Sequence, residues 1–156
     1  MNKWFYFNST VLLIAVWQVF HLFPTIPIHI VIGFIGVVFI LFNWTRHAVF
    51  STIRNTSDRN RKIRLANMSK KILPFHRWIG TTALFIIIIH AILVIDIYGL
   101  YWRNAKYVSG FVTGLILIGM VTTGWMRLLR PTGRKRKAHI YFGLALFFFV
   151  TIHVML

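Results

Sequence analysis

Four histidines lie in two apolar segments of this chain at one repeated spacing. The two matching patterns are His76-Arg-Trp-Ile-Gly80 followed by His90, and His139-Ile-Tyr-Phe-Gly143 followed by His153. In each segment the histidines are fourteen residues apart, which on an α-helix means about 21 Å of rise and a shared helix face. Iron–nitrogen bonds are about 2 Å long, so the two histidines of one segment cannot bind the same metal ion.

The pairing of the histidines follows from the order of the segments. One other apolar segment separates the two, so as membrane helices they run in the same direction. His76 and His139 then lie at one depth, and His90 and His153 at another. Two axial histidines per iron, in a chain without cysteine, are typical of non-covalent b-type haem. The pattern therefore predicts two b haems, each held between two parallel helices.

Glycines and cations accompany the predicted haem ligands. Gly80 and Gly143 lie one turn beyond the first histidine of each pattern, where a missing side chain lets a porphyrin approach the backbone. Close helix packing is the alternative reason for these glycines. Arg77 is predicted to pair with the inner haem propionates, together with Lys70, Lys71 and residues Arg134 to Lys137. Arg103 and Lys106 are the cations available to the outer propionates.

The composition is that of an integral membrane protein. The 156 residues are 58% hydrophobic and only 13% charged, against about 25% charged in soluble domains. Five segments are long and apolar enough for transmembrane helices of about 20 residues. They are Phe5–Phe23, Ile28–Trp44, Phe75–Ile97, Tyr107–Leu129 and His139–Leu156. We expect one all-α domain over residues 1–156, a helical membrane bundle whose haem-carrying half is 73–156.

The basic residues predict the orientation of this bundle. Of eighteen Lys and Arg, sixteen fall near the N-terminus, in the segments between spans two and three and between spans four and five, or in the span ends that adjoin these segments. Because cytoplasmic loops are enriched in Lys and Arg, we expect a cytoplasmic N-terminus and an external C-terminus, in a multi-pass protein of the cell membrane. The net charge of +16 comes from short runs between apolar segments, which does not favour nucleic acid as a partner.

The paired histidines, with Arg77 and Gly80 after the first, resemble the ferric-reductase-like transmembrane domain superfamily. That group includes ferric reductases, NADPH oxidases and the haem subunit of a methionine-sulfoxide reductase system. The resemblance covers roughly His76 to His153 and implies that His76 and His139 ligate an inner haem, and His90 and His153 an outer one. Such proteins usually have six spans, and the oxidases continue into a flavin–nicotinamide module. Here a partner chain, or further residues of a longer protein, would have to provide that module.

Two functions are compatible with this pattern. One is a di-haem cytochrome, an oxidoreductase or electron-transfer subunit, that passes electrons from a cytoplasmic flavoprotein to an outer acceptor such as ferric iron or an oxygen species. The alternative is a quinol-linked cytochrome b anchor of a larger respiratory enzyme. His21, His29 and His47 are most simply interfacial polar residues. A less favoured interpretation places an outer metal or quinone site at His21, His29 and Asp96.

Overall fold

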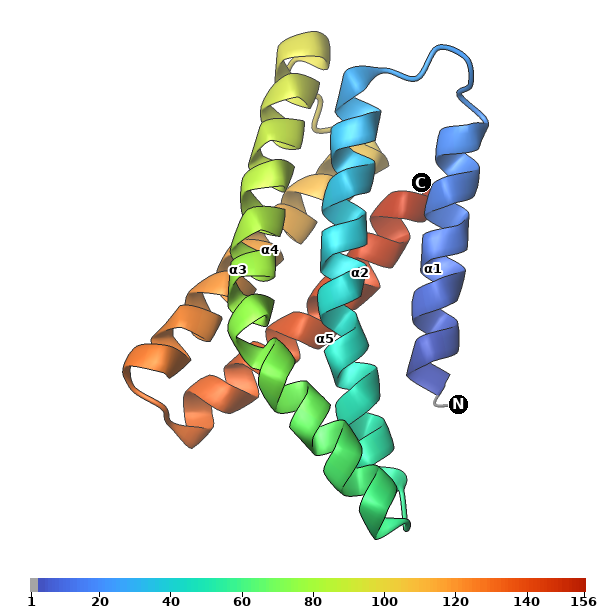
Figure 1. Ribbon diagram of the computed structural model, residues 1–156. Coiled ribbons are helices and arrows are strands. Elements are labelled where there is room, and N and C mark those ends of the chain that lie inside the picture. The colour runs from blue at the N-terminus through green and yellow to red at the C-terminus, as the bar shows by residue number, and fades with distance from the viewer. Residues whose placement is uncertain (1–2) are drawn as a thin grey trace.

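The protein is an all-helical bundle in the computed structural model, which describes residues 3–156 (Figure 1). The five helices are α1 (Lys3–Phe20), α2 (Ile28–Asn55), α3 (Arg59–Tyr98), α4 (Ala105–Leu129) and α5 (Gly133–Met155). Helices account for 87% of the described residues, and no strand occurs among them. The predicted all-α class and the number of helices are confirmed.

Four of the five helices are long and apolar enough to cross a membrane, namely α2, α3, α4 and α5. The sequence predicted a fifth span over Phe5–Phe23, and α1 forms there, but it is not one of the four. Lys3, Asn8 and Gln18 lower the mean hydropathy of this helix. Large apolar side chains also face outward, among them Phe20 at 72% and Leu13 at 68% exposure. Such an exterior is typical of a membrane protein and would be unfavourable in water.

Polar residues begin three of the helices. The carboxylate of Asp58 accepts hydrogen bonds from the backbone N–H groups of residues 60 and 61 and thereby caps α3. Asn104 caps α4 in the same way, and Thr132 caps α5 through the N–H of residue 135. At the other end of α3, Gly99 has a φ of 70°, and its carbonyl accepts a hydrogen bond from the hydroxyl of Tyr107. These contacts fix where α3 ends and α4 begins.

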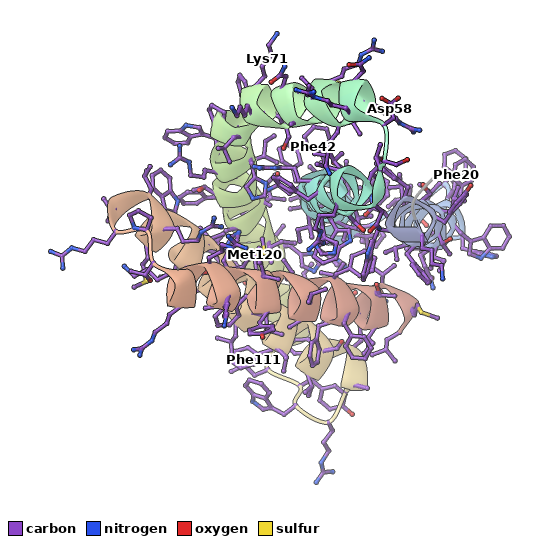
Figure 2. All side chains as sticks on the ribbon, turned by 90° about the horizontal axis from the view of Figure 1, so that it is seen from below. Phe20, Phe42, Asp58, Lys71, Phe111 and Met120 are labelled. Atoms are coloured by element: carbon purple, nitrogen blue, oxygen red, sulfur yellow. The ribbon has the colours of Figure 1, made fainter. Side chains whose placement is uncertain are left out.

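Helix α3 is longer than the predicted span. The sequence predicts that Pro74 interrupts the helix just before a span starting at residue 75. In the structure, however, α3 is continuous from Arg59 to Tyr98. Figures 1 and 2 show that α3 changes direction midway, so that the part before Pro74 runs obliquely across the end of the bundle. A proline removes one backbone hydrogen bond and commonly bends a long helix, which is the outcome seen here.

The helices pack mainly in two pairs. α2 lies along α3, α4 lies along α5, and α1 covers α2 and part of α5. Leu117 of α4 and Leu146 of α5 are fully buried between these layers, with Ala83 of α3 and Leu41 of α2. In this arrangement the histidine-bearing helices α3 and α5 face each other across the interior, and the neighbouring helices α2 and α4 flank the histidines.

Candidate functional site

Two histidine pairs form between α3 and α5. The ring centres of His76 and His139 are 6.2 Å apart, with the ring planes at 84°. The ring centres of His90 and His153 are 6.5 Å apart, with the planes at 75°. The structure therefore brings together the residues that the sequence pairs by depth. We call His76 and His139 the inner pair, and His90 and His153 the outer pair.

The ring separations match the dimensions of an iron with two imidazole ligands. An iron–nitrogen bond is about 2 Å long, and an imidazole centre lies about 1 Å behind its ligating nitrogen, which places two trans ring centres about 6 Å apart. Both observed separations are close to this value. Among residues 3–156 no three His, Cys, Asp or Glu side chains gather as a metal site. Each pair thus offers two protein ligands, which suits a metal held equatorially by a macrocycle.

A hydrogen-bond acceptor contacts the Nδ1 atom of each paired histidine. Nδ1 of His90 donates to the carbonyl of His29 at 2.7 Å, and Nδ1 of His139 to the carbonyl of Met120 at 3.0 Å. The other two contacts are from His153 to the carbonyl of Lys106 and from His76 to Oδ1 of Asn43, both at 3.1 Å. A carbonyl oxygen only accepts, so each Nδ1 carries the proton and each Nε2 keeps its lone pair. This is the arrangement that metal-ligating histidines typically show.

Glycines provide the space for three of the four imidazole rings. A Cβ atom at Gly33 of α2 would lie 2.8 Å from the ring of His90, and one at Gly110 of α4 would lie 2.8 Å from the ring of His153. Gly124 of α4 stands in the same relation to His139 at 3.3 Å. The sequence pattern singled out Gly80 and Gly143 as the glycines beside the haems. The structure places Gly80 beside Asn43 and Gly143 at ordinary contact distance from Trp44.

These glycine contacts lead to a direct prediction. Gly110→Ala should displace the His153 ring and reduce the haem content of the protein by about half, because the new methyl group and the ring cannot both fit. Gly114→Ala is the matched control, one turn further along α4, where a Cβ meets nothing within 4 Å. Haem content per chain, measured by absorbance after purification, distinguishes the two variants. Equal haem content in both would show that the His153 ring is not held against Gly110.

The inner pair borders a cavity of about 270 Å³ that contains cations and no acid. Arg77 of α3 and Arg127 of α4 line it together with His76 and His139. Arg46 of α2 is close enough for its charge to act on both histidines, and its Nε atom is buried without a hydrogen-bond partner. Because the cavity is slightly smaller than typical ligand pockets, a haem there requires the lining side chains to move apart.

The cation nearest to the outer pair is a lysine. Lys106 lies in the first turn of α4, and its backbone carbonyl accepts the hydrogen bond of His153. Its charge is close enough to act on both His90 and His153. Arg103, the other cation that the sequence predicts for the outer propionates, lies in the loop before α4 and, like Lys106, is exposed. Position in the sequence could not separate these two cations, since they lie only three residues apart.

The three remaining histidines, His21, His29 and His47, each contact different residues and do not contact one another. His29 is 5% exposed, its ring centre is 6.5 Å from that of His90, and its Nδ1 has no hydrogen-bond partner. His21 is exposed and packs edge-on against Trp17, and His47 stacks on Trp44. The less favoured outer metal site at His21, His29 and Asp96 is not formed, because no such three-residue group exists in residues 3–156.

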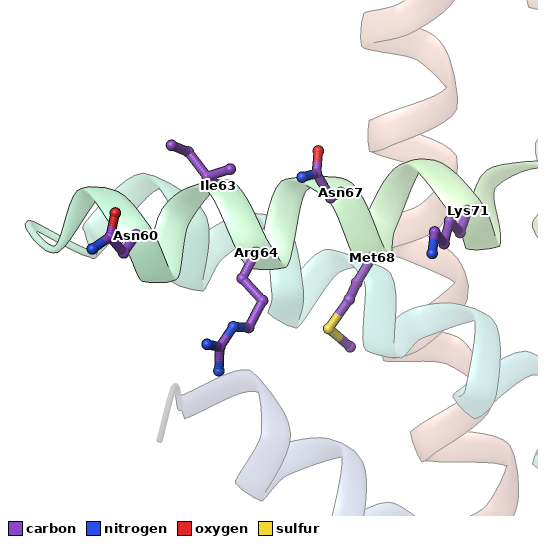
Figure 3. Close-up of a pocket in the computed structure, with 6 residues that line it drawn as sticks. All are labelled: Asn60, Ile63, Arg64, Asn67, Met68 and Lys71. Atoms are coloured by element: carbon purple, nitrogen blue, oxygen red, sulfur yellow. The ribbon is translucent and has the colours of Figure 1, made fainter.

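A second hollow lies away from the histidines. It is an open groove of about 430 Å³ along one face of the first half of α3 (Figure 3). The side chains that border it are Asn60, Ile63, Arg64, Asn67, Met68 and Lys71. All six precede Pro74 and belong to a single helix, so the groove has no opposing wall of residues to orient a ligand. The histidine pairs are therefore the better candidates for binding a metal or cofactor.

Comparisons with known proteins do not identify a family for this chain, so any functional interpretation depends on the geometry of the site. No protein-family model, curated protein or solved structure matches the chain. The resemblance seen in the histidine spacing therefore stays an interpretation of the sequence.

Proposed function

We propose that the protein is a di-haem b-type membrane cytochrome that carries electrons across the cell membrane. The observation that carries this proposal is the presence of two histidine pairs, at 6.2 and 6.5 Å, whose Nδ1 atoms are all engaged by acceptors. His76 and His139 would hold the inner haem, and His90 and His153 the outer one. A haem bound at each pair supplies reversible one-electron chemistry.

The charges around the inner pair support an anionic cofactor. Arg46, Arg77 and Arg127 surround or line that site, and the chain has only two acidic residues. One of these, Asp58, caps α3, and the other, Asp96, lies in the last turn of that helix. Partly buried guanidinium groups without carboxylates are unfavourable unless an anion joins them. The propionates of a haem provide two such anions, and Lys106 offers the corresponding charge at the outer pair.

The proposed orientation places the inner pair near the cytoplasm. Most of the basic residues lie where α2 joins α3 and where α4 joins α5, chiefly in the adjoining ends of these helices. Figure 1 shows both of these joints toward the same end of the bundle as the N-terminus. The positive-inside rule then puts this end in the cytoplasm and the C-terminus of α5 outside. His76 faces the cytoplasmic side, and His90 lies about 21 Å further along α3, in the outer half of the membrane.

The donor and the acceptor follow from this polarity. A cytoplasmic flavoprotein reductase, or a flavin-bearing partner subunit with an acidic surface, complements the basic cytoplasmic end and supplies electrons. The acceptor is an external substrate such as ferric iron or an oxygen species. Lipid covers the exposed apolar faces of the helices. In this role the protein itself positions the ligands, excludes water from them and compensates the charge of the cofactor.

One observation favours the quinol-linked alternative. His29 is buried beside His90 with a free Nδ1, and its ring centre lies 5.5 Å from that of Tyr98. Quinone headgroups require hydrogen-bonding groups next to a haem, and His29 and Tyr98 are groups of that kind on the outer side. In this second candidate function the protein anchors a larger respiratory enzyme and exchanges electrons with quinol in the membrane.

The haem stoichiometry tests the proposal itself. We expect two b-type haems per chain in the purified membrane-embedded protein, because each histidine pair holds one iron. A pyridine haemochrome assay together with a protein determination gives this ratio, and a reduced-minus-oxidised spectrum shows bis-histidine low-spin bands. A colourless protein would refute the cytochrome assignment, and a ratio of one would refute the scheme of two independent pairs.

A further inference from the structure

Asn43 of α2 contacts the inner pair from outside the set of proposed ligands. Its side chain is 7% exposed, and it lies within α2, a candidate membrane span. An amide in such a place is costly unless its polar atoms are satisfied. Here Nδ2 donates to the backbone carbonyl of His76 at 3.1 Å, and Oδ1 contacts Nδ1 of the same residue at 3.1 Å. Both polar atoms of the amide are therefore used on one histidine.

The two contacts together determine the orientation of the amide. Because the carbonyl of His76 can only accept, the NH₂ group of Asn43 must face it. The amide oxygen then faces the imidazole and must accept the proton of Nδ1. The lone pair of His76 is consequently fixed on Nε2, on the side of the ring available to an iron. Orientation and tautomer of the ring are thus set by one neighbouring side chain.

This contact distinguishes His76 from the other paired histidines. His90, His139 and His153 donate to backbone carbonyls, which every residue type provides. For His139 and His153 the hydroxyls of Thr123 and Ser109 add side-chain contacts, at 3.3 and 3.1 Å. Among the four paired histidines, only His76 donates to a side-chain carbonyl, the amide oxygen of Asn43. Of the four Nδ1 hydrogen bonds, the one from His76 is therefore the one whose strength a single substitution can change most directly.

Gly80 belongs to the same arrangement. A Cβ atom at this position of α3 would lie 3.2 Å from Nδ2 of Asn43, tighter than most side-chain contacts. Gly80 is buried and borders the inner cavity, so its missing side chain leaves space for the amide as well as for a ligand. The glycine that the sequence pattern assigned to the porphyrin thus also accommodates the residue that orients His76.

We propose that Asn43 is the positioning residue of the inner haem ligand and sets the reduction potential of that haem. The inference rests on the proposed function, because it concerns His76 as an iron ligand. An acceptor on Nδ1 increases the electron donation of the imidazole and favours ferric iron over ferrous iron. Asn43 therefore adjusts the inner haem without touching the iron, while the outer haem is unaffected by it.

The test uses two substitutions with opposite expected effects. Asn43→Asp keeps the shape and supplies an anionic acceptor, so the inner haem should become harder to reduce. Asn43→Leu removes the acceptor, so the inner haem should become easier to reduce. A change of about tenfold in the relative affinity for the two iron states corresponds to about 59 mV in each direction. Potentiometric titration of the full chain in lipid nanodiscs measures both haems, and the outer haem serves as the internal reference.

Asn8→Leu is the matched control. Asn8 of α1 also donates its amide to a backbone carbonyl of α2, that of Leu41 at 3.2 Å, but it contacts no histidine. Its substitution should leave both potentials unchanged. Shifts of equal sign in Asn43→Asp and Asn43→Leu, or equal shifts of both haems, would overturn the positioning role. They would instead indicate a general effect on packing.

A measurement without haem separates this inference from the proposed function. In the apoprotein labelled with ¹⁵N-histidine, His76 should show a single Nδ1-protonated tautomer, and Asn43→Leu should convert it to a mixture. If the native protein binds no haem but this tautomer is present, the proposed function fails and the contact from Asn43 stands. If the protein binds two haems, and His76 shows the same tautomer in the native apoprotein and in the Asn43→Leu apoprotein, the proposed role of Asn43 is wrong.

Discussion

Replacing any one of the four paired histidines by alanine is expected to remove one haem and leave the other. His76→Ala and His139→Ala should each eliminate the same spectral species, since both ligands of the inner iron come from one level of the bundle. His90→Ala and His153→Ala should eliminate the other species. Each single variant should retain about half of the native haem, because loss of one axial ligand removes an essential iron–protein bond.

Double variants make the assignment of partners unambiguous. The pair His76→Ala and His139→Ala should have the same haem content as either single variant, because both changes act on one site. The pair His76→Ala and His90→Ala should have none. Redox titration followed by difference spectroscopy measures each species, and His21→Ala is the control, since this exposed histidine lies outside both pairs. The pairing is wrong if His76→Ala and His90→Ala prove to affect one common species.

The placement of the histidines could be predicted because it depends on periodicity alone. A spacing of fourteen residues sets both depth and helix face, and two spans with one between them must cross the membrane in the same direction. The spacing by itself therefore brings His76 to the level of His139. The structure adds that the ring centres approach to 6.2 Å. Such a distance depends on how α2 and α4 hold α3 and α5 in place, which the spacing does not determine.

The groups that hold the rings could not be predicted in the same way. Asn43 and Gly33 lie on α2, and Gly110 lies on α4, far in sequence from the histidines that they contact. Identifying them requires the rotation and height of each helix relative to its neighbours, which a hydropathy pattern does not contain. The one available signal was chemical. A buried asparagine in an apolar span needs partners for both ends of its amide, and the histidines of neighbouring spans offer them.

The helix ends could also be predicted only in part. Asp58, Asn104 and Thr132 are residue types that favour the start of a helix, and each begins one here. The continuation of α3 through Pro74 was not predicted, because proline by itself favours a break in a helix. In this bundle the residues before Pro74 still pack on α2, as the buried Ser69 shows, and such contacts maintain the helix on both sides.

Electrons are expected to enter from the basic, cytoplasmic end, and the rate should fall as salt is added. Most of the positive charge lies in the adjoining ends of α2 and α3 and of α4 and α5, whereas Arg103 and Lys106 are the basic residues at the other end of the bundle. An acidic flavoprotein is steered to the basic end by charges that 0.1 M salt screens beyond about 10 Å. Raising the salt from low to physiological concentration should slow haem reduction by about tenfold, within the range of electrostatic steering.

Oriented vesicles with the donor confined to one side measure this directly. Neutralising Lys135 and Arg136 by glutamine should reduce both the rate and its salt dependence, because both residues lie in the first turn of α5, at the basic end of the bundle. Arg103→Gln is the control, because it removes an exposed charge from the loop before α4 at the other end of the bundle, and it should leave reduction from the cytoplasmic side unchanged. Rapid reduction from the external side alone, insensitive to salt, contradicts the proposed direction. Because quinol is neutral and reaches the outer pair through the membrane, that result would favour the quinol-linked function.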